Sequence, residues 1–111
     1  YKKIEPIFLK IFDNKIPLND YSYINLLVEF YQNIYENEKD KFLRIAENNY
    51  KLPKAKRIYI STDETLIKNK RNIEETVFYE INFSSKRILK IIFNLKNEMN
   101  LEDLEIILRD K

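Results

Sequence analysis

The side chains that could carry chemistry in this sequence are carboxylates, amines, guanidinium groups and phenols. The chain contains no Cys and no His. It therefore lacks a thiolate nucleophile, the usual general base near neutral pH and the commonest metal ligand. It also contains no Gly, which phosphate-cradling loops normally need for tight turns and close backbone approach. The composition excludes most common enzyme designs.

Acid-base catalysis would have to come mainly from carboxylates. Asp63, Glu64 and Glu80 are the candidates for a nuclease-like metal site, with Lys90 as a neighbouring cation. Their spacing is not diagnostic, and the acidic-x-lysine element of restriction-type nucleases does not occur at Glu80. We therefore predict a non-enzymatic protein that uses no metal ion and no small-molecule cofactor.

Positive charge is concentrated in the middle of the chain. Residues 51–90 carry ten Lys and Arg against five Asp and Glu, whereas the formal net charge of the whole chain is only +2. If these cations gather at one edge of a sheet, they could neutralise the phosphates of a nucleic acid. Tyr59 and Phe78 could then stack on its single-stranded bases. The candidate nucleic-acid-binding residues are Lys51, Lys54, Lys56, Arg57, Lys68, Lys70 and Arg71.

The abundance of lysine has a second explanation. Lys, Asn and Ile together make 45 of the 111 residues, and Lys outnumbers Arg by 15 to 5. These three residues have AT-rich codons, so the composition indicates an AT-rich genome. A solvated Lys-rich surface is therefore the alternative to a nucleic-acid-binding one.

The elements that position these groups follow from the apolar pattern. Residues 77–95 contain two runs of alternating apolar and polar residues around a short polar break, which is typical of a β-hairpin. The predicted register places Phe83 opposite Leu89 and Val77 opposite Leu95. Phe78 and Ile92 fall on the other, nominally wet face. Either another segment of the chain covers that face or a partner does.

The remaining segments supply helices and one more strand. We predict a short helix over residues 5–12, a loop over 13–20 and a helix of about 28 residues that begins after Asp20, in preference to two helices with a bend near Asn37. Residues 54–61 are predicted as a strand with Tyr59 outward. Residues 62–75 form either a loop or one or two helical turns, which Ser61 and Glu64 would cap. Asn100 would cap a C-terminal helix over residues 101–108.

These elements predict an α+β domain. The N-terminal helices, short and then long, should pack on one face of a small antiparallel sheet of about three strands, with the C-terminal helix beside them. Residues 1–111 are long enough for one domain but not for two. The chain begins with Tyr1, so we expect it to be a piece of a longer protein. Apolar runs do not exceed three residues, which predicts no membrane span.

The favoured function is a non-enzymatic protein-interaction module. It would present the outer sheet face or a tyrosine-rich helix to a protein partner or to another copy of itself. The predicted contact residues are Tyr31, Tyr35, Tyr59, Phe78 and Ile92. Nucleic-acid binding through the basic region is the alternative, and salt would distinguish the two because phosphate binding weakens steeply with ionic strength. The sequence predicts no compartment.

Overall fold

A computed structural model describes residues 4–110 of the chain. Within this range the chain forms an α+β fold, as predicted, with two three-stranded antiparallel sheets. The lower sheet has the order β2 (Asn14–Pro17), β1 (Ile4–Ile11), β6 (Glu105–Asp110). The upper sheet has the order β3 (Ile60–Ser61), β5 (Val77–Glu80), β4 (Lys70–Ile73).

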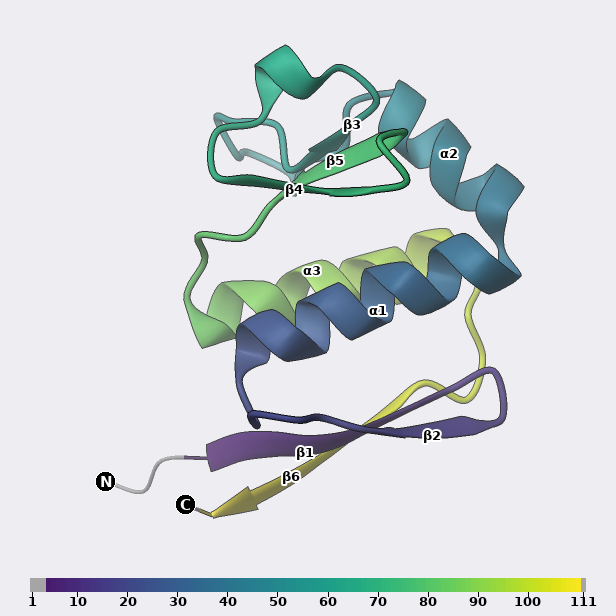
Figure 1. Cartoon of the computed structure of the whole chain (residues 1–111), viewed down its shortest axis with the longest axis vertical. Coiled ribbons are helices and arrows are strands. Elements are labelled where there is room, and N and C mark those ends of the chain that lie inside the picture. The colour runs from purple at the N-terminus through teal and green to yellow at the C-terminus, as the bar shows by residue number, and fades with distance from the viewer. Residues whose placement is uncertain (1–3, 111) are drawn as a thin grey trace.

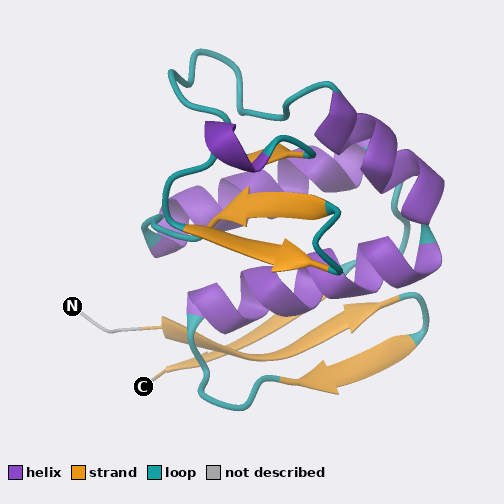
Figure 2. Ribbon diagram, turned by 45° about the horizontal axis from the view of Figure 1, so that its top comes forward, coloured by secondary structure: helices purple, strands orange, loops and turns teal. Residues whose placement is uncertain are grey.

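A layer of two helices separates the sheets. Figure 1 shows α1 (Tyr23–Asn37) and α3 (Ser85–Glu98) lying between the lower and upper sheets, and the turned view of Figure 2 shows the same order. Helix α2 (Lys39–Glu47) flanks the upper sheet, and a single 3₁₀ turn, η1 (Glu64–Leu66), precedes β4. Within residues 4–110 no helix has both the length and the apolar character needed to cross a bilayer.

Residues 5–11 belong to strand β1 and Phe12 to the turn after it, so the predicted short helix over residues 5–12 is wrong. The apolar residues in this segment recur at helical spacing because β1 contains an irregularity between Pro6 and Phe8, which shifts the usual two-residue alternation. Pro6 has no backbone N–H to donate. It lies outside the part of β1 that pairs with β2, so no hydrogen bond between these two strands depends on it. The predicted loop that follows contains β2, which is joined to β1 by a turn with Phe12 and Asp13 at φ 51° and 64°.

The long helical segment is divided in two, so the prediction of one 28-residue helix is wrong and the alternative with a bend is confirmed. Ser22, not Asp20, caps α1 by accepting a hydrogen bond from the Asn25 amide at 2.9 Å. Glu38 leaves the helical conformation with φ −135° and ψ 48°. This break lets Phe42 fold back onto Tyr31, with ring centroids 5.7 Å apart.

The predicted hairpin over residues 77–95 is half right. Its first run is β5, but its second run is α3, which Ser84 caps by accepting from the Arg87 amide at 3.2 Å. The buried residues of α3 follow helical spacing: Ile88, Ile91, Ile92 and Leu95. The predicted strand pairings between the two runs therefore do not exist. Ile92, the residue that did not fit the hairpin, is fully buried.

Asn100 ends a helix instead of beginning one. It adopts φ 54°, a left-handed conformation common just after a helix, and the predicted helix over residues 101–108 is absent. The chain instead returns as β6 alongside β1, where Ile106 lies opposite the buried Leu9.

The segment before β4 also differs from expectation. The predicted strand over 54–61 is reduced to Ile60 and Ser61, and Tyr59 is buried in place of facing outward. The 3₁₀ turn is capped by Asp63 and not by Ser61, since Asp63 accepts hydrogen bonds from the Thr65 amide and hydroxyl. These hydrogen bonds hold the pKa of the Asp63 carboxyl below its ordinary value.

Tyr31 provides a test of the packing between the helix layer and the upper sheet. Its ring lies 4.7 Å from that of Tyr79, but its buried hydroxyl has no hydrogen-bond partner in the part of the chain that the structure describes. Burial raises the pKa of Tyr31 well above its ordinary value. We expect Tyr31→Phe to raise the free energy of unfolding by about 1 kcal/mol, because it removes an unsatisfied polar group.

The matched control is Tyr50→Phe, measured by urea unfolding beside Tyr31→Phe. The hydroxyl of Tyr50 donates to the Asn94 side chain at 2.6 Å, so its removal should lower the free energy of unfolding by about 1 kcal/mol. Equal destabilisation by the two substitutions would contradict the described environment of Tyr31.

Candidate functional site: a basic groove beside α3

The loop that joins α2 to β3 lies against the first turns of α3 and forms a groove with it. Two adjoining hollows of about 480 and 500 Å³ open there, and Arg87 borders both. The first is lined by Lys54, Ala55, Lys56, Arg57, Tyr59, Asn82, Phe83, Ser84 and Arg87. The second is lined by Leu52, Pro53, Arg87, Lys90, Phe93, Asn94 and Asn97. Together we call these two hollows the basic groove.

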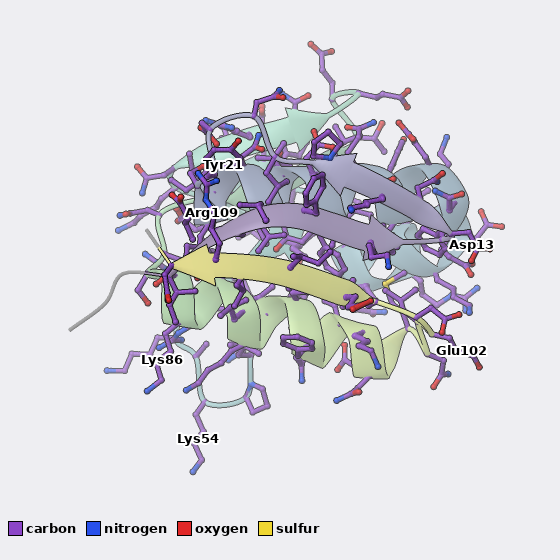
Figure 3. The ribbon with its side chains drawn as sticks, turned by 90° about the horizontal axis from the view of Figure 1, so that it is seen from below. Asp13, Tyr21, Lys54, Lys86, Glu102 and Arg109 are labelled. Carbon is purple, nitrogen blue, oxygen red and sulfur yellow. The ribbon has the colours of Figure 1, made fainter. Side chains whose placement is uncertain are left out.

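The charges that line the basic groove all have the same sign. Five cationic residues line it and, among the described residues, no Asp or Glu does. The cations are Lys54, Lys56, Arg57, Arg87 and Lys90, and all five are exposed. The groove also includes Ser84, the N-cap of α3, where the helix dipole adds positive potential. Figure 3 shows Lys54 and the neighbouring Lys86 on the same side of the molecule.

Arg57 is held in place by three contacts. Its Nη2 donates to the Asn82 carbonyl at 2.9 Å, and its guanidinium lies 5.0 Å from the centroid of the Phe83 ring. Its Nη1 lies 3.9 Å from the carboxylate of Glu80, a residue that is almost fully buried beneath it. These contacts fix the direction of the guanidinium while leaving about half of the side chain exposed.

Arg87 is held by a buried phenol. Its Nη1 donates to the hydroxyl of Tyr59 at 2.8 Å, and the Tyr59 ring packs against Phe83 with centroids 4.7 Å apart. Tyr59 therefore supports the groove from beneath and does not offer its ring to a ligand. The sequence-based prediction of Tyr59 as a stacking surface is wrong, because its ring is buried between the loop and α3.

A different hollow of about 530 Å³ lies where α2 and α3 end, but two of its cations already donate to backbone carbonyls, one of them at the end of α3. It is lined in part by Lys41, Arg44, Lys51 and Glu98. Lys41 donates to the Met99 carbonyl at 3.4 Å and Lys51 to the Ala55 carbonyl at 2.7 Å. Cations near helix C-termini complement unpaired carbonyls and the helix dipole. This hollow also holds a carboxylate, so it is a weaker anion site than the basic groove.

The predicted nucleic-acid-binding residues are only partly brought together. Lys54, Lys56 and Arg57 line the basic groove, and Lys51 lies in the neighbouring hollow. The other three, Lys68, Lys70 and Arg71, line neither part of the groove, and Lys70 is paired with Glu64 at 3.4 Å. Arg87 and Lys90 fall within the predicted basic region 51–90 but are not among its seven candidate residues, and Phe93 is not among the candidates, because their segment is predicted as part of a hairpin. Ser84, a good N-cap before a helical apolar pattern, was the signal that could have found them.

Four of the five predicted protein-contact residues lie in the core. Tyr31, Tyr35, Tyr59 and Ile92 are buried, and Phe78 is half-buried. The four buried side chains therefore form no contact surface on the folded chain. For Tyr31 and Tyr35 the prediction assumed that a helix buries only one face, whereas α1 lies between two sheets and buries more of its circumference.

The acidic residues do not form a metal site within residues 4–110. No three carboxylates there come close enough to hold an ion. Asp63 accepts from Thr65, Glu64 pairs with Lys70, and Glu80 lies beneath Arg57. The three candidate carboxylates thus have separate partners.

Comparison with protein-family models, curated proteins and solved structures finds no match to this chain. The functional argument therefore rests on the geometry and charge of the groove.

The bond between Arg87 and Tyr59 gives a test of the groove's architecture. We expect Arg87→Ala to lower the free energy of unfolding by about 1 kcal/mol, because the buried Tyr59 hydroxyl loses its partner. Lys86→Ala, one residue away and exposed, should change it by less than about 0.5 kcal/mol. Chemical denaturation of both variants measures the difference, and equal values would contradict the supporting role of Arg87.

Proposed function

We propose that the protein is a non-enzymatic module that binds single-stranded nucleic acid in the basic groove. The observation that carries this proposal is the segregation of charge: five cations and no carboxylate line two adjoining hollows. A groove of this kind attracts a polyanion, and binding is favoured by the release of counterions from the phosphates.

The cations of the groove suit two tasks. Arg57 and Arg87 are held by hydrogen bonds to the protein, so they are already oriented toward a phosphate. Lys54, Lys56 and Lys90 form no ion pair with other residues in the range 4–110, so their amines are available to a phosphate. The fixed guanidinium groups define a position for the backbone, and the flexible lysines neutralise its charge.

Phe93 favours a single strand over a duplex. Its ring is 46% exposed and borders the second hollow together with Lys90, one helical turn earlier on α3. An exposed ring in such a hollow can stack on an unpaired base, whereas the bases of a duplex already stack on one another. Each stack of this type contributes roughly 1–3 kcal/mol.

Protein interaction is the second candidate function. With Tyr31, Tyr35, Tyr59 and Ile92 buried and Phe78 half-buried, the feature that favours it is the edge of β6 with which no strand in residues 4–110 pairs. This surface shares no residue with the basic groove.

Fluorescence anisotropy of a labelled single-stranded oligonucleotide tests the first proposal. The double variant Lys54→Ser, Lys56→Ser should bind at least tenfold more weakly at low salt. It should also reduce the slope of log K against log salt by about 1.4, because two phosphate contacts are lost. Phe93→Ala should weaken binding about tenfold at every salt concentration, since stacking does not release counterions.

The control is the double variant Lys15→Ser, Lys39→Ser, which removes the same charge from β2 and α2. Neither residue lines the groove, so its affinity should stay near that of the unaltered protein. Equal weakening by both double variants would indicate a non-specific charge effect. Absence of binding at about 20 mM salt, where phosphate contacts are strongest, would refute the proposal.

A further inference from the structure

The two edges of the lower sheet differ in a way that points to a partner strand. β2 is short and carries Lys15 and Pro17, which are features that discourage further pairing. β6 has six residues and no proline, and Leu108 on it is 42% exposed. No strand in residues 4–110 pairs with the outer edge of β6. Such an edge presents backbone donors and acceptors to another chain.

The pairing of β6 with β1 determines which face each β6 residue occupies. Glu105 lies opposite Lys10 and Arg109 opposite Glu5, and both pairs form ionic contacts, at 3.7 and 2.8 Å. Side chains alternate along a strand, so Ile107 shares the outer face with Glu105 and Arg109. Ile106 and Leu108 face the helix layer, and Ile106 packs against the core.

We propose that β6 pairs antiparallel with β6 of a second copy of this chain, about a two-fold axis at Ile107. In this register Glu105 of each copy lies opposite Arg109 of the other. Ile106 likewise lies opposite Leu108, so the helix-side faces of the two sheets are continuous. The charged residues of this edge are therefore complementary to those of a second copy, which is what identifies the partner.

Neighbouring registers lack this complementarity. An axis at Leu108 would place Ile107 opposite Arg109 and Ile106 opposite Asp110. An axis at Ile106 would place Glu105 opposite Ile107. Registers shifted by an odd number of residues would join the helix-side face of one copy to the outer face of the other. Over Glu105–Arg109 the register centred on Ile107 matches charge with charge and apolar with apolar, and it places Asp110 opposite Leu104, which lies outside β6.

The two-fold axis limits the assembly to a dimer. Pairing produces a six-stranded sheet whose two outer edges are the β2 strands, and these resist further addition. One strand pair buries a small area, so we expect a dissociation constant in roughly the micromolar range. The residues that line the basic groove lie on α3, on the segment that precedes it and on the loop between α2 and β3, so pairing through β6 uses none of them.

Charge reversal tests the register directly, with molar mass measured by light scattering at about 200 μM, well above the expected dissociation constant. The unaltered chain should be dimeric. Glu105→Arg and Arg109→Glu should each be monomeric, because like charges then face each other across the axis. An equimolar mixture of the two variants should recover the dimer, since both cross-chain pairs are again opposite in charge. Monomeric unaltered protein, or no recovery in the mixture, would refute the register.

Three controls separate this outcome from a loss of folding. Glu102→Arg makes the same charge change outside β6, and Lys10→Ala removes the partner of Glu105 within the chain, so both should remain dimeric. Circular dichroism checks that each variant is folded. Hydrogen exchange of the β6 amides in the unaltered chain should also slow as concentration rises, and exchange that is independent of concentration would refute pairing at this edge.

Discussion

The burial of α1 between the two sheets is the constraint on which the rest of the structure depends. Figure 1 shows α1 lying, beside α3, between the lower and the upper sheet. Tyr31 illustrates the result, because its buried ring contacts Phe42 of α2 and Tyr79 of β5. α1 can contact both sheets because its buried residues, among them Leu26, Tyr31 and Tyr35, extend around much of its circumference. The buried residues of α3 form a single stripe, so the opposite face of α3 is exposed and borders the basic groove.

The same constraint explains which parts of the fold could be predicted. The α+β class and the strand at Val77–Glu80 follow from local apolar patterns, whereas those patterns allow either one long helix or two over the segment that forms α1 and α2. The sequence predicts a contact surface at Tyr31 and Tyr35, because a helix that is buried on one face cannot bury all of its tyrosines there. A single sequence does not reveal that a second sheet covers the opposite face of the helix. The burial of these tyrosines therefore depends on long-range packing.

Two local errors had specific physical causes. In β1 the irregularity near Pro6 changes the alternation of side chains, so a strand acquires helical spacing. In residues 88–95 the spacing of the apolar side chains fits both the two-residue repeat of a strand and the repeat of a helix. Ser84 caps α3, and this favours the helix. The misassigned hairpin separated Arg87 and Lys90 from Lys54 and Lys56, so the sequence predicted only the loop half of the groove.

The codon composition of the chain accounts for the number of its lysines but not for their placement. The sequence holds 18 Asp and Glu beside 20 Lys and Arg, so a surface assembled without regard to charge would mix the two signs. Elsewhere the cations do lie beside carboxylates, as in the pairs of Lys10 with Glu105 and Lys70 with Glu64. At the basic groove the carboxylate that forms an ion pair with a lining cation, among the described residues, is that of Glu80, which is buried and holds Arg57 from beneath. A carboxylate in that position orients a cation without offering an anion to solvent, which is the arrangement that an anionic ligand requires.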